Sequence, residues 1–508
     1  MSGQAPSVER ATIQSTGPTR GLARRTVVAL GFSLATSTSG RVFTIAATFA
    51  LARLLTPNDF GIANIGALVL TILLPVTDIG IARALVRARK EELSQQARTA
   101  FWLVVLLGVA MAAVLFLASG WVASFYGRQE IEPTLRVIGV SVVLYSISRI
   151  PSALLERELL QGRKAIPEMA AALTYGITAI ALAYLHFGYW SVVAAMVARS
   201  AVLSGGLFLV AKWRPGLAFD MEVAHELISS ARLLMATSVI RLIYTNVDNA
   251  VVGKILGITA LGYYAMAYNL GNLAAVQVAG ALGAVLFPMY ARLLPDLAGV
   301  RQMTLRILRY TSIVVIPITL LGIIATPRLV PLALGPRWAP LTLALQILLV
   351  YGCFHSLGPI YWALLMAKDL NQINLRINLV SLVVALLAAL PVAATYGFNG
   401  VAAEFTLLEI WRFLSLVWAA RQQFALGVRL QAWALGPAIT GSCLACIALL
   451  TMGMVWRPAH ILVLGSQLLV ASALYLSYLV ATGPLAWGEM AGMVRTLKRR
   501  PSASASAA

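Results

Sequence analysis

Charged side chains are scarce in this chain, because only 11% of its 508 residues are Asp, Glu, Lys or Arg. A soluble chain carries about a quarter charged residues, so the composition excludes a water-soluble globular protein. Cysteine is also rare and occurs only at Cys353, Cys443 and Cys446, inside apolar runs. The single C-x-x-C has no second pair at zinc-ligand spacing, so we expect these cysteines to be small packing residues.

Recognisable motifs for catalysis are lacking as well. The chain contains no nucleotide-binding motif, no metal-ligand cluster and no nucleophile triad. We therefore expect no catalytic residue, no metal site and no cofactor. The polar N-terminus from Met1 to about Gly21 does not lead directly into a short apolar run with a small-residue cleavage site, so it is expected to be a cytoplasmic tail and not a signal peptide.

Long apolar runs are what the chain has in abundance, and 60% of its residues are hydrophobic. Runs of about 20 residues, the length that crosses a bilayer, recur from Val27 to Thr482. We predict an all-α polytopic membrane protein with about 14 transmembrane helices. The predicted spans are 27–51, 60–82, 99–119, 135–153, 167–187, 189–211, 232–254, 260–290, 309–333, 340–366, 372–396, 399–420, 433–455 and 459–482.

The net charge of +20 has a simple explanation in such a protein. When the N-terminus is placed inside, most Lys and Arg residues of the loops fall on the cytoplasmic side, as the positive-inside bias requires. The pattern predicts that both termini are cytoplasmic and that the number of spans is even. No basic domain or recognition-helix pattern points to nucleic acid, so no nucleic-acid partner is expected.

Two stretches of the chain are similar to each other. Arg53 and Lys254 stand 201 residues apart, and so do Gly61 and Gly262. Each stretch leaves a long span, makes a short outer turn and enters the next span through its glycine. The repeat predicts that the first six spans and the next six are two related halves, an arrangement common in transporters. The expected domains are 1–26 (basic tail), 27–211 (N-terminal lobe), 212–231 (linker), 232–420 (C-terminal lobe), 421–482 (two additional spans) and 483–508 (tail).

The same stretches resemble a known family. L-A-R-L-L-T-P-x-D-F-G at 51–61, D-x-G-x-x-x-A-L-V-R at 78–87, V-D-N-A-V-V-G-K-I-L-G-x-x-A-L-G-Y-Y at 247–264, A-Y-N-L at 267–270 and L-F-P at 286–288 are similar to the polysaccharide transporter and flippase family. This family belongs to the multidrug/oligosaccharidyl-lipid/polysaccharide superfamily. The resemblance implies two pseudo-symmetric six-helix lobes around a central cavity. It also implies alternating access and an undecaprenyl-pyrophosphate-linked oligosaccharide as substrate in the bacterial inner membrane, for exopolysaccharide, capsule or lipopolysaccharide synthesis.

Ionisable and polar side chains inside the spans are the candidate substrate-binding residues. A charge in the hydrocarbon costs on the order of a few kcal/mol, so it faces a cavity or a partner. Arginines suit the negative pyrophosphate, and aromatic rings with amides suit sugars. The candidates are Arg41, Arg149, Arg199, Arg241, Asp248, Tyr264, Tyr268 and Asn269.

Other roles for these residues stay open at this point. The arginines could snorkel to the headgroups or pair between helices, and the tyrosines could be interfacial anchors. Asp248 could belong to a structural network or couple transport to H⁺ or Na⁺. Glu409 and Arg412, three residues apart on one helix, could neutralise each other.

Two alternative functions remain beside the flippase. A cation-coupled multidrug exporter of the same superfamily would favour acids and aromatics in its pocket. A polysaccharide polymerase or glycosyltransferase would need a sizeable outer loop, and the outer loops here are short. The expected partners are the lipid-linked oligosaccharide, membrane lipid, a polysaccharide polymerase and its chain-length machinery.

Overall fold

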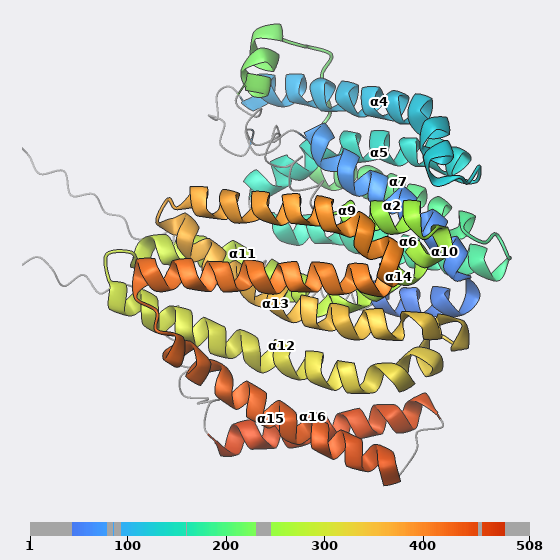
Figure 1. The fold of residues 1–508 in the computed structure, drawn as a ribbon. Coiled ribbons are helices and arrows are strands. Elements are labelled where there is room, and N and C mark those ends of the chain that lie inside the picture. Colours follow the sequence, from blue (N-terminus) through green and yellow to red (C-terminus); the bar gives the residue numbers. More distant parts are fainter. Residues whose placement is uncertain are drawn as a thin grey trace, which may run out of the picture.

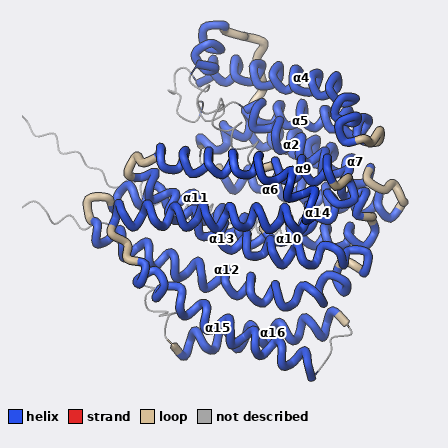
Figure 2. The backbone as a smooth tube through the Cα atoms, viewed as in Figure 1, coloured by secondary structure: helices blue, strands red, loops and turns tan. Residues whose placement is uncertain are grey.

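The described part of the chain is a bundle of long helices. The computed structural model describes residues 43–78, 85, 93–158, 160–229, 245–455 and 460–482. All of the regular elements in these residues are helical, and they run roughly side by side (Figures 1 and 2). Ten of the helices are long and apolar enough to cross a membrane. The predicted all-α polytopic class is thereby confirmed, whereas the count of 14 spans stays a prediction.

The N-terminal half comprises the described helices up to residue 211. The helices α4 and α5 pack together, α6 packs on α7, and α5 also contacts α7. The first helix is described from Phe43 onwards. The helices are Phe43–Leu54, α2 (Pro57–Asp78), α4 (Leu93–Tyr126), α5 (Ile131–Arg157), α6 (Gln161–Tyr184) and α7 (Trp190–Ala211).

The C-terminal half comprises the helices from residue 247 to 424. The helix α13 lies at its centre and packs against α10, α11, α12 and α14. Two further helices follow, and both contact α12 on the outside of the bundle (Figure 1). The elements are α9 (Val247–Ile255), α10 (Ile258–Gly271), α11 (Leu273–Leu293), α12 (Leu297–Ala333), the 3₁₀ helix η1 (Pro336–Leu341), α13 (Thr342–Ala367), α14 (Asn371–Phe424), α15 (Val428–Val455) and α16 (Ile461–Ala481).

The helix α14 consists of two antiparallel arms. A straight helix of 54 residues would be about 80 Å long, far more than the 30 Å of hydrocarbon. Gly397 breaks it with φ 64° and ψ −160°, a conformation open only to glycine. The chain therefore turns back between the two predicted spans 372–396 and 399–420, and Figure 1 shows the two arms side by side.

The predicted span 260–290 is wrong in one respect, because it is interrupted. The helix α10 ends at Gly271 and α11 begins at Leu273. At this point α10 touches the backbone of α13: a Cβ on Gly352 would lie 2.2 Å from the carbonyl oxygen of Gly271. Two glycines let the helices approach this closely, which the apolar pattern alone does not reveal.

The two halves meet where α2 crosses α10. A Cβ on Gly61 would lie 2.0 Å from the carbonyl oxygen of Ile258, and a Cβ on Gly262 would lie 1.8 Å from that of Pro57. Pro57 and Ile258 begin the two helices and are themselves 201 residues apart. Each glycine therefore faces the start of the other's helix, as two repeats related by a two-fold axis would require.

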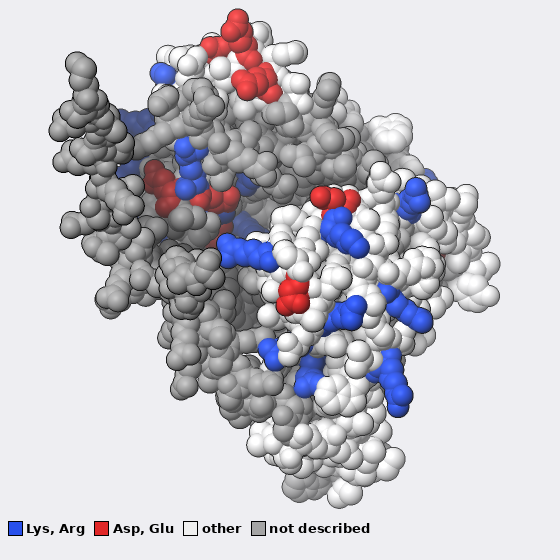
Figure 3. Space-filling model, turned by 90° about the vertical axis from the view of Figure 1, so that its left-hand side faces the viewer, with Lys and Arg blue, Asp and Glu red and all other residues white. Residues whose placement is uncertain are grey.

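The two ends of the bundle differ in charge. We call the end at which α5 and α7 end and α12 begins the basic end, and the opposite end, at which α4 and α12 end, the far end. Figure 3 views the basic end, where Lys and Arg outnumber acidic side chains on the described surface. The positive-inside bias predicts an excess of Lys and Arg of this kind on a cytoplasmic face.

Candidate functional site

Asp248 is a buried carboxylate in the first turn of α9. Its side chain is 1% exposed. The hydroxyl of Tyr264 on α10 donates to Oδ2 at 2.8 Å, and the backbone N–H and side-chain amide of Asn249 donate to Oδ1 at 2.8 and 3.1 Å. The side-chain amide of Asn64 on α2 donates in turn to the side-chain Oδ1 of Asn249 at 3.2 Å. The described partners of this carboxylate are all neutral, so its charge is hydrogen-bonded without a matching cation.

Glu404 lies close to Asp248. The second arm of α14 packs on α9, and the charge of each carboxylate acts on the other. Both carboxylate oxygens of Glu404 are buried and form no hydrogen bond with the described residues. Two neighbouring carboxylates with neutral surroundings favour the uptake of a proton or cation, because their mutual repulsion is relieved when one is neutralised.

A row of rings leads from Asp248 into the C-terminal half. The rings of Tyr264 and Tyr268 stack at 6.4 Å on α10, and Tyr268 faces Tyr351 on α13 at 5.7 Å. Tyr351 stacks on His355 one turn further along α13, at 5.3 Å. Offset aromatic pairs of this kind hold their rings in place, so the row is a rigid connection between α10 and α13.

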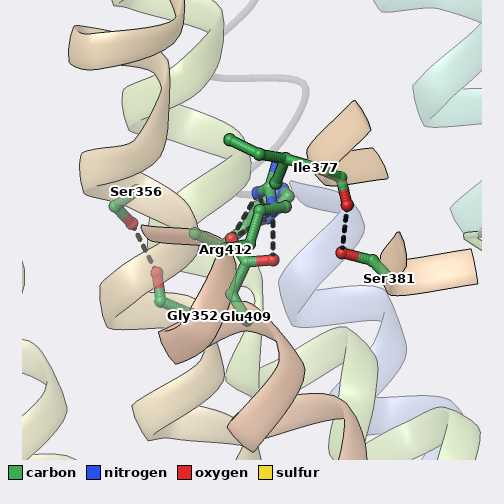
Figure 4. Close-up of polar contacts among 7 residues, drawn as sticks. Gly352, Ser356, Ile377, Ser381, Glu409 and Arg412 are labelled. Carbon is green, nitrogen blue, oxygen red and sulfur yellow. Dashed lines mark hydrogen bonds and ion pairs between the residues drawn. The ribbon is translucent and has the colours of Figure 1, made fainter. Parts of the chain in front are cut away.

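Glu409 and Arg412 end this row on α14. Glu409 is 1% exposed, and its Oε2 accepts from Arg412 Nε at 2.9 Å while Oε1 accepts from Arg412 Nη2. His355 Nδ1 lies 3.1 Å from Glu409 Oε1. Figure 4 shows Glu409 and Arg412 pointing toward one another on α14. The predicted neutralisation of this pair is confirmed, and His355 joins it.

These residues form one connected network across five helices. We call it the polar ladder. It begins beside the crossing of the two halves and continues through the interior of the C-terminal half. Its members are Asn64, Asp248, Asn249, Tyr264, Tyr268, Tyr351, His355, Glu409 and Arg412. Ionisable groups at this depth are costly in a membrane and are found mainly where they serve transport.

The structure separates the predicted arginines from the predicted acid. Arg149 on α5 and Arg199 on α7 belong to the N-terminal half, where α5 and α7 pack together. Arg199 is exposed in the middle of its helix, and the half-buried Arg149 lies with its guanidinium 5.4 Å from the centre of the Tyr145 ring. Arg41 and Arg241 lie outside the described residues.

The tyrosines and the amide of α10 differ in their surroundings. Tyr264 is 0% exposed, so the interfacial-anchor interpretation is wrong for this residue: its hydroxyl serves Asp248 and does not reach an interface. Tyr268 is half-buried and Asn269 is exposed. The sequence analysis overlooked Tyr351 and His355. His355 is one of only four histidines and lies inside an apolar span, which is the signal that marks it.

The fold and the ladder define a class of protein. The described residues include ten helices long and apolar enough to cross a membrane, two halves that meet reciprocally and ionisable groups in the interior. These are the features of a multi-pass inner-membrane transporter. The sequence model for polysaccharide biosynthesis proteins matches residues 50–343. The chain belongs to this family.

Two curated relatives illustrate the family. The lipopolysaccharide biosynthesis protein WzxC of Escherichia coli (strain K12) is 27% identical over 364 residues, which cover 71% of this chain and 73% of WzxC. The succinoglycan biosynthesis transport protein ExoT of Rhizobium meliloti (strain 1021) is 25% identical over 290 residues, 57% of this chain. The match spans 58% of ExoT, less than two thirds of its length.

Solved structures share the fold. The lipid II flippase MurJ in an inward closed conformation superimposes with a TM-score of 0.71 at 13% identity, and the match covers 89% of this chain and 99% of MurJ. A multidrug resistance MATE family transporter in an inward-facing conformation gives a TM-score of 0.60 at 13% identity, over 79% of this chain and 98% of that protein. At 13% identity the similarity to these two structures shows a shared fold and nothing further.

Proposed function

We propose that this protein moves an undecaprenyl-pyrophosphate-linked oligosaccharide repeat unit across the bacterial inner membrane by alternating access. The two halves are the moving lobes, 27–211 and 232–420, in a protein of 14 spans with both termini inside. The repeat unit serves the synthesis of exopolysaccharide, capsule or lipopolysaccharide. The names of WzxC and ExoT, which are proteins of lipopolysaccharide and succinoglycan biosynthesis, support this class of substrate.

The observation that carries the proposal is the presence of ionisable groups inside both halves. Arg149 and Arg199, on the N-terminal helices α5 and α7, supply cations for a pyrophosphate. The C-terminal half holds buried carboxylates, one of them paired with Arg412, and a row of aromatic rings. Arg41 in the first span and Arg241 in the seventh are proposed to add to the cationic path, and Tyr268 and Asn269 to face the sugars.

The polar ladder is proposed to couple transport to an ion gradient. Asp248 and Glu404 would take up H⁺ or Na⁺, because two adjacent carboxylates without a described cation gain most from neutralisation. The ladder connects this pair to the start of α2, so a change of charge at Asp248 acts on the surface where the halves meet. The fully buried Tyr264 is then a positioning residue for Asp248.

The test is a clean deletion of the gene in its host, followed by analysis of lipid-linked oligosaccharides and of surface polysaccharide. We expect a single repeat unit to accumulate on the cytoplasmic face and the surface polymer to be lost. Return of the gene with Arg199→Ala should restore polymer poorly. The matched control is Arg214→Ala, because Arg214 is an exposed arginine in the loop after α7, outside the spans. It should restore polymer fully.

Other outcomes of the deletion would contradict the proposal. Lipid-linked units that reach the outer face but stay unpolymerised would indicate a polymerase instead of a flippase. Normal amounts of both lipid-linked oligosaccharide and surface polysaccharide would show that the protein does not transport a polysaccharide precursor. Equal restoration by Arg199→Ala and Arg214→Ala would leave the flippase intact but exclude Arg199 from the cationic path.

A cation-coupled multidrug exporter is the second candidate, and the buried carboxylates of the C-terminal half favour it. The same fold occurs in the MATE transporter structure. The exporter predicts that the deletion strain becomes sensitive to cationic drugs while its surface polymer stays normal. The flippase predicts unchanged growth in the presence of these drugs.

A further inference from the structure

Arg53 and Lys254 each cap a long helix of the opposite half. Arg53 ends the first described helix, and its Nε donates to the Ala333 carbonyl at 2.9 Å while Nη2 donates to that of Leu332, in the last turn of α12. Lys254 ends α9, and its Nζ donates to the Phe125 carbonyl at 2.5 Å, in the last turn of α4. The last carbonyls of a helix carry partial negative charge, so both cations are attracted to them.

The two caps are equivalent under the internal repeat. Arg53 and Lys254 are 201 residues apart. The helices that they cap also hold equivalent places, because α4 follows α2 in the N-terminal half as α12 follows α10 and α11 in the C-terminal half. Each cation therefore crosses from its own half to the other. A cation that capped its own half would stabilise that half alone, whereas these two hold the halves to each other.

Aromatic side chains repeat the same reciprocal pattern next to the caps. The indole of Trp338 is fully buried and donates to the Ala52 carbonyl at 2.7 Å. At the equivalent place in the other repeat, Gly253 lies against the ring of Tyr126, which a Cβ there would approach to 2.8 Å. Ala52 and Gly253 are again 201 residues apart. A bulky ring thus fills the space beside each cap.

All of these contacts lie at one end of the molecule. Among the described residues, the hydrogen bonds that join the two halves involve only positions 52–64, 125, 249–254 and 332–338, all near the far end. Residues 79–84, 86–92 and 230–244 lie outside the described part of the chain. The charge distribution assigns the far end to the outer face of the membrane.

We propose that Arg53 and Lys254 form a reciprocal clasp that closes the transport path at the far end and must release both caps for that end to open. The inference rests on the alternating access of the proposed function. The clasp uses backbone carbonyls as acceptors, so it closes without an acidic partner that a passing pyrophosphate would repel. The Arg53 side is the stronger one, because the Arg53 side chain donates to two carbonyls and that of Lys254 to one.

The test measures the separation of the halves at the far end. Spin labels are attached at two exposed positions, Gln129→Cys in the turn after α4 and Ala339→Cys in η1, with the three native cysteines replaced. Double electron–electron resonance on the purified protein gives the distance distribution. The double variant Arg53→Gln/Lys254→Gln should raise the ratio of the long to the short distance about tenfold, because each helix-end cation contributes on the order of a two- to fivefold preference.

Matched variants make the result specific. Arg128→Gln removes an exposed cation from the same end that makes no described side-chain bond, and it should leave the distribution unchanged. The conservative Lys254→Arg should keep the native distribution, and Arg53→Gln should shift it more than Lys254→Gln. If the double variant does not fold, Lys254→Gln alone, which removes one cap, gives the same readout with a smaller shift.

Two results would overturn the clasp: a native distribution in the variants that lack the caps, or an equal shift in Arg128→Gln. The measurement needs no substrate, so it is independent of the polysaccharide assay. If the distance distribution shifts but the deletion strain has a normal pool of lipid-linked oligosaccharide, the clasp is supported and the flippase is rejected. If the distribution does not shift but the deletion strain accumulates a repeat unit, the clasp is rejected and the flippase is supported.

Discussion

Gly61 and Gly262 hold equivalent places in the two repeats, and each lies against the first carbonyl of the other's helix. In both cases the nearest atom that would collide with a Cβ is a backbone carbonyl oxygen, so neither clash can be relieved by turning a side chain alone. The close contact of α2 with α10 therefore depends on the absence of two Cβ atoms.

Gly61→Ala should destabilise the joined halves. A methyl group here would force the backbones of α2 and α10 apart, and overpacking of this kind costs about 1–3 kcal/mol. The measurement is the thermal unfolding of the purified protein in detergent. Gly205→Ala on α7 is the control, because nothing lies within 4 Å of its Cβ position and alanine favours a helix. Equal melting temperatures for the two variants would contradict the tight crossing.

Arg412→Met should be strongly destabilising, since it leaves the carboxylate of Glu409 buried without its cation. Breaking a buried pair in this way costs about 3–5 kcal/mol. The double variant Glu409→Gln/Arg412→Met should recover part of the loss because no charge is left unpaired. Arg421→Met, which removes an exposed arginine of the same helix, serves as the control and should unfold like the native protein. Additive losses in the double-mutant cycle would show that the pair is not coupled.

Tyr264→Phe should weaken the fold through Asp248. The variant removes a hydrogen bond to a buried carboxylate, which contributes about 1.5–3 kcal/mol. Chemical unfolding in detergent followed by tryptophan fluorescence measures the change. Tyr396→Phe removes a hydroxyl from a tyrosine that is exposed near the bend of α14 and should change nothing. If both variants behave alike, the bond to Asp248 contributes no stability.

Asp248→Asn and Glu404→Gln should abolish the dependence of transport on an ion gradient. Either change removes one of the two charges whose repulsion favours ion uptake. Transport in inverted vesicles, with and without imposed H⁺ and Na⁺ gradients, measures the effect. The control is Asp369→Asn in the exposed turn before α14, where asparagine suits the left-handed backbone (φ 59°). Full gradient dependence in Asp248→Asn would exclude the ladder from coupling.

Asp220 should make the segment after α7 sensitive to acid. Its carboxylate accepts backbone bonds from Val223 and Glu222, which lower its pKa below the ordinary 3.8. Because the pKa is lower in the folded state, the ionised carboxylate stabilises the fold at any pH above its ordinary pKa. This contribution is lost as the pH falls through the lowered pKa. The protection factors of the amide hydrogens in the helical residues 221–229, which compare the observed exchange with that of an unfolded chain at the same pH, should therefore fall at acidic pH. Asp220→Asn should exchange faster at neutral pH and lose this acid dependence; an unchanged pH profile would contradict the assignment.

Much of the fold could be read from the sequence because membrane-spanning segments obey a local rule. Each helix satisfies its own backbone hydrogen bonds and needs about 20 apolar residues, so its existence depends on composition alone. The adjacent predicted spans 167–187 and 189–211 correspond to α6 and α7, and the short turn between these helices has His186 and Gly188 at positive φ. The interruption of α10 at Gly271 was missed because its cause lies in another helix.

The candidate site could be predicted only in part. Asp248, Glu409 and Arg412 stood out because charges within apolar runs are rare, and the spacing of the last two fixed their pairing. The contact of Tyr264 with Asp248 joins residues 16 positions apart on two helices, and that of His355 with Glu409 joins residues 54 apart. Periodicity gives the face of one helix but not the neighbour that it meets.

The sequence by itself determined the class of this protein: an apolar, basic, helical membrane chain built from two related halves. It also determined which residues are equivalent, because the offset of 201 residues is a property of the chain. Only the tertiary structure decided that equivalent residues meet across the two halves, where Arg53 caps α12 and Lys254 caps α4. The physical reason is that a helix end attracts any cation within reach, and reach is set by packing and not by sequence distance.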